Sequence, residues 1–192
     1  MGHMRVTVAS AAVGLLLLVV AVAGCGASAR GHASGPFAWL KPAAPPTGWH
    51  VAVTRGGATL AYPPGWAAIR TDPGTASVAL LAGGGRLEGY LNATPRQGTE
   101  TLANWSRFRP QHNAGEGQRD VRLLAATTAG HFRSGRGACV IDTYTTSTMS
   151  YHEIACLVSS ARSSAVVVAA APSALWDELA TTLQRAVSSF RA

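Results

Sequence analysis

Alternation of apolar and polar residues along most of the chain predicts a protein built mainly from β-strands. Segments with this period of two, separated by Gly- and Pro-containing turns, run from residue 50 to residue 158. Such alternation is typical of strands that bury one face. We expect strands at 50–55, 58–62, 66–70, 77–82, 89–94, 138–146 and 150–158, a strand within 120–129, and a short strand and turn at 131–137. A wholly apolar segment, 165–171, is expected to be a central strand.

Two segments have helical spacing instead. Residues 99–109 carry apolar side chains on one side, with Thr99 as the predicted cap, and Pro110 is expected to end this helix. The eight polar residues that follow are expected to form a loop. The second helix is expected to start at Ser173 as its N-cap and to run to about Phe190.

The segments 138–146 and 150–158 predict a hairpin with a two-residue turn at 147–148. In that register the numbers of paired residues sum to 295, so Cys139 lies opposite Cys156. The pair falls on a non-hydrogen-bonded rung, where Cα atoms approach to ~4.5 Å. A disulfide accepts that separation. Ser-Thr is a poor two-residue turn, so a longer loop with a shifted register remains open.

The same register predicts three further features of the hairpin. Tyr144 lies opposite Tyr151, which is favourable. Asp142 lies opposite Glu153, which is unfavourable unless an arginine bridges the two carboxylates. His152 shares a face with the two cysteines.

The first 25 residues resemble a bacterial lipoprotein signal. An uncharged run from Val6 to Ala23 is followed by Gly24 and Cys25, so Val22-Ala23-Gly24 comes directly before the cysteine. Small residues before a cysteine look like a lipobox, which implies that Cys25 is acylated and becomes the first mature residue. One alternative is an uncleaved transmembrane helix, because 18 residues fall within the ~17–25 that span a bilayer. The other is a plain secreted protein. Either Met1 or Met4 serves as the native start.

The three cysteines divide into one plus two. If Cys25 is lipidated, Cys139 and Cys156 remain, and the oxidising compartment outside the membrane favours a disulfide between them. The alternative is two free buried thiols. A metal site is not expected, since neither His131 nor His152 completes a zinc-module spacing.

The chain is basic, with 16 Lys and Arg against 9 Asp and Glu and a net charge of +7. The arginines are dispersed along the sequence, and no basic run occurs. A location outside the cytoplasm argues against a nucleic-acid partner. We expect only weak attraction to anionic envelope components or lipid headgroups.

The order of elements resembles the PsbP-like family. The resemblance rests on Tyr62-Pro63-Pro64-Gly65-Trp66, on the middle helix containing Trp105, and on Trp176 in the last helix. It covers about residues 50–191 and implies an α+β fold, an antiparallel β-sheet flanked by helices in an α/β/α sandwich. Together with the lipobox, the chain looks like the LpqN-type actinobacterial lipoproteins. The family implies largely non-enzymatic binding roles and supplies no catalytic residues.

Sequence motifs for catalysis are absent. Neither Gly-x-Ser-x-Gly nor His-Glu-x-x-His occurs, and the Gly run at 83–85 lacks the Lys and Ser/Thr of a phosphate loop. The best polar group is Asp142, His152 and Glu153 on the hairpin, with Arg133 or Arg136 nearby in sequence. His112 in the polar loop is a further weak ligand-binding candidate. The simpler interpretation is that these side chains are exposed to solvent or hydrogen-bonded within the protein, with no ligand.

These observations predict a signal peptide at 1–24, a lipidated and flexible tether at 25–48 and one domain at 49–192. We expect a non-enzymatic binding module anchored to the outer face of the cell membrane, with an envelope protein or lipid as partner. No cofactor or metal is expected. Two alternatives are an envelope hydrolase with an unrecognised site and a carrier of an apolar or lipid ligand. The carrier would need a cavity lined by Trp105 and Phe108.

Overall fold

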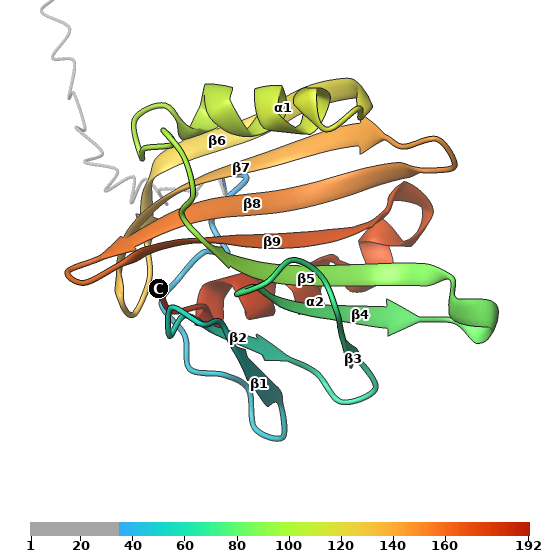
Figure 1. Ribbon diagram of the computed structural model, residues 1–192, viewed down its shortest axis with the longest axis horizontal. Helices are drawn as coiled ribbons and strands as arrows, with labels where there is room; N and C mark the ends of the chain where they lie inside the picture. Colours follow the sequence, from blue (N-terminus) through green and yellow to red (C-terminus); the bar gives the residue numbers. More distant parts are fainter. Residues whose placement is uncertain (1–34) are drawn as a thin grey trace, which may run out of the picture. The chain divides into compact units, whose positions relative to one another are not determined.

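Residues 35–192 are described by the computed structural model, and Cys25 lies outside the described residues. Nine strands and two α-helices follow one another in this part of the chain (Figure 1). Their bounds are β1 (His50–Val53), β2 (Thr59–Tyr62), β3 (Ala67–Ile69), β4 (Ala76–Leu81), β5 (Leu87–Pro95), α1 (Trp105–Gly115), β6 (Arg119–His131), β7 (Gly135–Thr145), β8 (Ser150–Ser160), β9 (Ser164–Pro172) and α2 (Trp176–Ser189).

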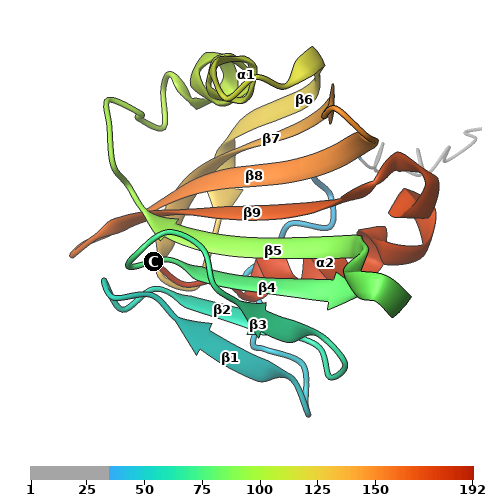
Figure 2. The same cartoon turned by 45° about the vertical axis from the view of Figure 1, so that its right-hand side comes forward.

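Seven of these strands form one antiparallel sheet in the order β3-β4-β5-β9-β8-β7-β6. Helix α1 covers the face of the sheet at β6 and β7, and α2 packs on the other face (Figures 1 and 2). The α+β class, with an antiparallel sheet flanked by helices, is therefore confirmed. Strands β1 and β2 pair only with each other, and an isolated bridge between Thr59 and Arg191 joins them to the end of α2.

Strand β9 is the middle strand of the sheet, as its apolar sequence predicts. It lies between β5 and β8, and eight of its nine residues are buried. Val167 and Ala169 contribute to the core under α2, whereas Val166 and Val168 contribute to the core under α1. A strand covered on both faces has no need of polar positions, which explains the continuous run of Val and Ala.

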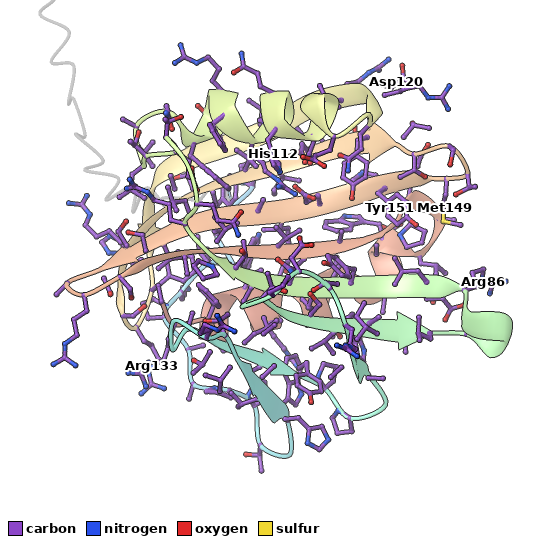
Figure 3. The ribbon with its side chains drawn as sticks, in the orientation of Figure 1. Arg86, His112, Asp120, Arg133, Met149 and Tyr151 are labelled. Carbon is purple, nitrogen blue, oxygen red and sulfur yellow. A yellow bond between two sulfur atoms is a disulfide. The ribbon has the colours of Figure 1, made fainter. Side chains whose placement is uncertain are left out.

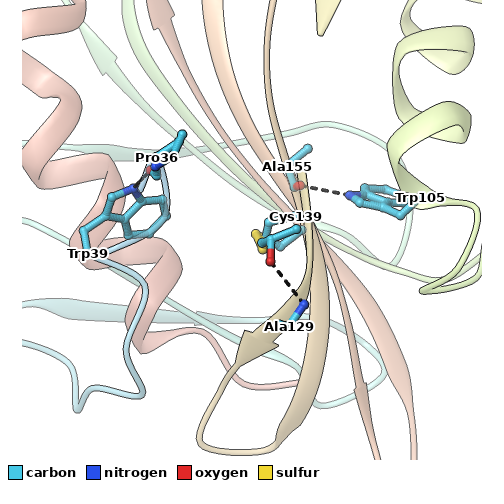
Figure 4. The surroundings of a disulfide bond; sticks show 8 residues. Pro36, Trp39, Trp105, Ala129, Cys139 and Ala155 are labelled. Atoms are coloured by element: carbon cyan, nitrogen blue, oxygen red, sulfur yellow. Dashed lines mark hydrogen bonds between the residues drawn. A yellow bond between two sulfur atoms is a disulfide. The ribbon is translucent and has the colours of Figure 1, made fainter. Parts of the chain in front are cut away.

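The β7–β8 hairpin has the predicted register. Every pair sums to 295, from Gly135 opposite Ser160 to Thr145 opposite Ser150, and Thr146 N donates to Met149 O at 2.9 Å to close the turn. A disulfide joins Cys139 and Cys156, whose Cα atoms are 4.1 Å apart. Figure 4 shows this bond inside the sheet, between the layer that contains Trp105 and the layer of α2.

Helix α1 differs from the prediction of a helix at 99–109. It starts six residues later and continues through Pro110 to Gly115, so the expected loop after Pro110 is largely helical. Thr101 and Asn104 hydrogen-bond each other's backbone N–H in a turn that comes before the helix. A proline inside a helix costs about 3 kcal/mol. Trp105 and Asn113, one on each side of Pro110, are both buried.

Helix α2 starts at Trp176, and Ser173 is not its N-cap. Residues 173–175 form a 3₁₀ turn, and the Ser173 hydroxyl is hydrogen-bonded to a histidine instead of to the helix backbone. The predicted apolar stripe is present, since Leu183, Val187 and Phe190 are completely buried.

The segment predicted as a tether contacts the domain over part of its length. Phe37, Trp39 and Leu40 pack against the core under α2, and Ala43 N donates to Ser188 O at 3.1 Å. The contacts of the folded unit therefore begin upstream of residue 49.

The Tyr-Pro-Pro-Gly-Trp segment places the Trp66 ring directly over Gly89 of β5. A Cβ atom on Gly89 would lie 2.5 Å from Trp66 Cη2. We therefore expect Gly89→Ala to lower the free energy of unfolding by about 1–3 kcal/mol, because the buried ring must shift. Urea unfolding measures this difference. Gly83→Ala is the matched control, since a Cβ there meets nothing within 4 Å. Equal stability of the two variants would contradict the packing described.

Candidate functional site

A polar cluster is buried between α1 and the sheet. Arg109 of α1 donates from Nε to Glu153 Oε1 at 2.6 Å and from Nη2 to Glu153 Oε2 at 2.8 Å. Glu153 lies on β8 opposite Asp142 of β7, so the register brings two carboxyl groups together. Glu153 is 1% exposed and Asp142 is not exposed at all. The arginine that the unfavourable pair requires is thus supplied by the helix.

Asp142 is the less well satisfied of the two carboxyl groups. Its Oδ2 accepts a long hydrogen bond of 3.4 Å from Asn113 Nδ2, and its Oδ1 has no partner among the described residues. Burial, and then the negative charge of Glu153, raise the pKa of Asp142 to about 8, although Arg109 acts in the opposite direction. Asp142 therefore holds a proton at neutral pH, and Arg109 and Glu153 remain as one balanced ion pair.

Both carboxyl groups of the cluster are closed to solvent, and the cluster holds α1 against the sheet. Trp105, Arg109 and Asn113 recur every four residues, so they lie on the helix face that meets the sheet. Trp105 Nε1 donates to Ala155 O at 3.0 Å, and Trp105 is 1% exposed. Burial also raises the pKa of Tyr144, the next inward-facing residue of β7. A substrate has no path to these carboxyl groups, which favours a structural role.

Beside the cluster, α1 borders a small pocket of about 230 Å³. Its lining includes Glu100, Trp105, Phe108, Arg109 and His112. The Phe108 ring stacks on Trp105 and on His112, with centroids 6.0 Å apart in each case. This volume is below the ~300–1,000 Å³ typical of small-molecule sites. His112, predicted in a loop, is therefore a helical residue at the rim of a small pocket.

The structure separates His152 from Asp142 and Glu153. Its ring faces the α2 side of the sheet, where Nδ1 is 3.1 Å from Ser173 Oγ and the ring stacks on Trp176 with centroids 5.0 Å apart. Burial lowers the pKa of His152, although Asp177 acts in the opposite direction. The expected grouping of Asp142, His152 and Glu153 is wrong, because adjacent residues of a strand point to opposite faces.

Arg133 and Arg136, expected near the carboxyl groups of the hairpin, lie elsewhere in the structure. Arg133 lies in the β6–β7 turn and Arg136 pairs with His131 and Ser159 at the same end of the strands. Arg109 and Asn113 take their place, and neither was predicted from the sequence. Their four-residue spacing from Trp105 and the unfavourable Asp142–Glu153 pair were the available signals.

A larger pocket lies at the end of the sheet where the β7–β8 turn is found. It has a volume of about 540 Å³, and its apolar lining includes Leu87, Met149, Pro172 and Leu175. Figure 3 shows Met149 and Arg86 at this end of the molecule. At the rim, Arg86 and Glu88 form an ion pair of 2.8 Å. Its volume is within the range of ligand sites.

No group of three or more His, Cys, Asp or Glu side chains in residues 35–192 could hold a metal ion. None of the helices described is long and apolar enough to cross a membrane.

Comparison with known proteins supports the fold. No protein-family model and no curated protein matches the sequence. The structure is similar to cyanobacterial PsbP (CyanoP) from Synechocystis sp. PCC 6803, with a TM-score of 0.57, 17% identity, and coverage of 76% of this chain and 92% of that one. The domain therefore has a PsbP-like fold.

Two weaker similarities were also found. One is to PA94, a protein of unknown function and putative regulator from Pseudomonas aeruginosa, with a TM-score of 0.49, 12% identity, and coverage of 73% and 94% of the two chains. The other is to LpqN, involved in cell envelope biogenesis of Mycobacterium tuberculosis, with a TM-score of 0.41, 11% identity, and coverage of 70% and 82%.

The raised pKa of Asp142 predicts a pH-dependent effect of Asp142→Asn. Between about pH 4 and pH 8 the carboxyl group is ionised in the unfolded chain but protonated in the fold. Unfolding then releases a proton, so this group's contribution to the free energy of unfolding falls as pH rises. Asn cannot ionise, and the stability of Asp142→Asn relative to wild type should increase by on the order of 3 kcal/mol from pH 5 to pH 8.

Urea unfolding at several pH values measures that difference. Asp120→Asn, at an exposed aspartate, is the control for the loss of one carboxylate. A difference between Asp142→Asn and wild type that stays constant with pH would show that Asp142 is ionised in the folded protein.

Proposed function

We propose that this protein is an LpqN-type lipoprotein, a non-enzymatic binding module held at the outer face of the cell membrane by lipidated Cys25. The small residues Val22-Ala23-Gly24 before Cys25 support the anchor. The Cys139–Cys156 disulfide supports an oxidising compartment, since such bonds persist outside the cytoplasm.

The observation that carries the binding role is the pocket of about 540 Å³ at the β7–β8 turn. Its lining is apolar, and Arg86, Glu88 and Ser150 provide polar groups at its edge. Met149 has a flexible thioether side chain, which adapts to different apolar surfaces. This arrangement suits the insertion of an apolar side chain from an envelope protein, with polar contacts around it.

A role as a carrier of apolar ligands has less support. The space between α1 and the sheet, where such a ligand would lie, is filled by Trp105 and by the Arg109–Glu153 ion pair. The pocket that remains beside Phe108 is less than half as large as the one at the β7–β8 turn.

Metabolic labelling with a palmitate analogue tests the anchor. We expect label on the wild-type protein and none on Cys25→Ser, because the thiol is the only acceptor in the proposed modification. Cys139→Ser with Cys156→Ser is the control for the loss of cysteines elsewhere and should keep the label. Equal labelling of wild type and Cys25→Ser would contradict the lipoprotein proposal.

Met149→Asp tests the pocket. A buried charge without a partner disfavours an apolar contact, so we expect partner binding to weaken by at least tenfold, as for a central interface residue. A photo-crosslinking residue at Ser150 first identifies the envelope protein bound in cells, and titration of that purified protein gives the affinity. Ser147→Asp is the matched control, since it adds the same charge at an exposed position of the same turn. Equal affinity of Met149→Asp and Ser147→Asp would exclude the pocket as the contact.

A further inference from the structure

The end of the sheet opposite the β7–β8 turn gathers arginines from separate parts of the chain. Arg133 comes from the β6–β7 turn, Arg162 from the β8–β9 turn and Arg191 from the residues after α2. All three line one hollow of about 560 Å³, together with Gly56 and Gly57 of the β1–β2 turn. Figure 3 shows Arg133 at this end, with Arg86 and Met149 at the other. We call this end of the sheet, where Arg133, Arg162 and Arg191 lie, the arginine end.

The charge at the arginine end is uncompensated by nearby side chains. The lining contains no Asp or Glu, and it has at most one carboxylate, that of Ala192. Arg133, Arg162 and Arg191 are exposed, and neither of the two ion pairs found in residues 35–192 involves them. Three exposed guanidinium groups around one hollow create a local positive potential.

The β8–β9 turn that carries Arg162 is held in shape. Arg162 N and Ser163 N donate to Ser160 Oγ at 3.2 and 3.1 Å, and Ser160 N donates to Ser163 O at 2.8 Å. Arg96 lies beside this turn, since its N donates to Ser164 O at 3.0 Å. The positive surface is therefore broader than the hollow and rests on an ordered backbone.

The chain from the proposed anchor reaches the domain near this end. Leu40 Cδ2 is 3.3 Å from the position of a Cβ on Gly130, next to the β6–β7 turn. Leu40 follows Cys25 by fifteen positions, and that length of chain spans at most ~50 Å. An anchored domain is thus confined close to the membrane, with its arginine end within reach of the surface.

We propose that the arginine end docks on anionic phospholipid headgroups, through Arg133, Arg162 and Arg191 contacting lipid phosphates. This proposal rests on the membrane anchor described above. Guanidinium groups bind phosphate oxygens through paired hydrogen bonds. Each basic residue at an anionic surface increases the docking constant about fivefold. In this orientation the pocket at the β7–β8 turn points away from the membrane, where partners can reach it.

Hydrogen exchange of the full chain in nanodiscs tests the proposal. Discs of phosphatidylcholine alone are compared with discs containing about a third phosphatidylglycerol, and the readout is the exchange rate in the turns around 133 and 162. We expect anionic lipid to slow this exchange severalfold at low salt, and 0.5 M NaCl to remove the protection. The triple variant Arg133→Gln, Arg162→Gln, Arg191→Gln should lower the docking constant by about 100-fold and abolish the protection.

Arg107→Gln, Arg119→Gln and Arg122→Gln together form the matched control, because they remove the same charge at exposed positions outside the hollow and should leave the protection intact. Urea unfolding confirms that both triple variants are folded. Exchange rates that do not depend on lipid charge would overturn the proposal. Exchange that is slowed equally in the two triple variants would also overturn it. Equal protection by inorganic phosphate in neutral discs would also overturn it, since the site would then bind soluble anions.

The mass of Cys25-containing peptides, measured on the same preparation, separates this proposal from the anchor. An unmodified Cys25 contradicts lipidation, whereas dependence of the exchange on lipid charge reports on the arginine end alone.

Discussion

The register of the β7–β8 hairpin is the constraint on which the rest of the structure depends. Side chains alternate between the two faces of a strand, so a shift by one residue would exchange the faces completely. Cys139 and Cys156 are bonded across the hairpin and fix the alignment. With this alignment Ile154 lies in the core under α2, and Val140 and Ala155 lie in the core under α1.

The same alignment creates the polar cluster and so determines where α1 lies. It places Asp142 directly opposite Glu153 on the α1 face, and two buried carboxyl groups need a cation and a proton. Arg109 supplies the cation and Asp142 retains the proton. An ion pair of this kind adds little net stability, but removal of one partner leaves a buried charge. We infer that it specifies the position of α1 on the sheet.

Local patterns were sufficient to predict most of the strands, the central place of β9 and the hairpin register. The segment 131–137, expected as a short strand and turn, is instead divided between the end of β6, a turn and the start of β7. The boundaries of α1 were wrong, because the buried face of that helix carries Arg109 and Asn113 and does not show an apolar stripe. The separation of His152 from Glu153 follows from strand alternation alone. The arginine end could not be predicted in the same way, since Arg133, Arg162 and Arg191 are far apart in sequence and only the turns of the sheet bring them together.

In the proposed orientation the domain has two functional ends, one facing the lipid and one facing partners. Paramagnetic relaxation from gadolinium-chelating lipids in an anionic nanodisc reports the distance of each backbone amide from the bilayer surface. The proposed orientation predicts the strongest broadening at Arg133 and Arg162 and the weakest at Ser147 and Met149 of the β7–β8 turn. Equal broadening at both ends, or stronger broadening at Met149, would contradict it.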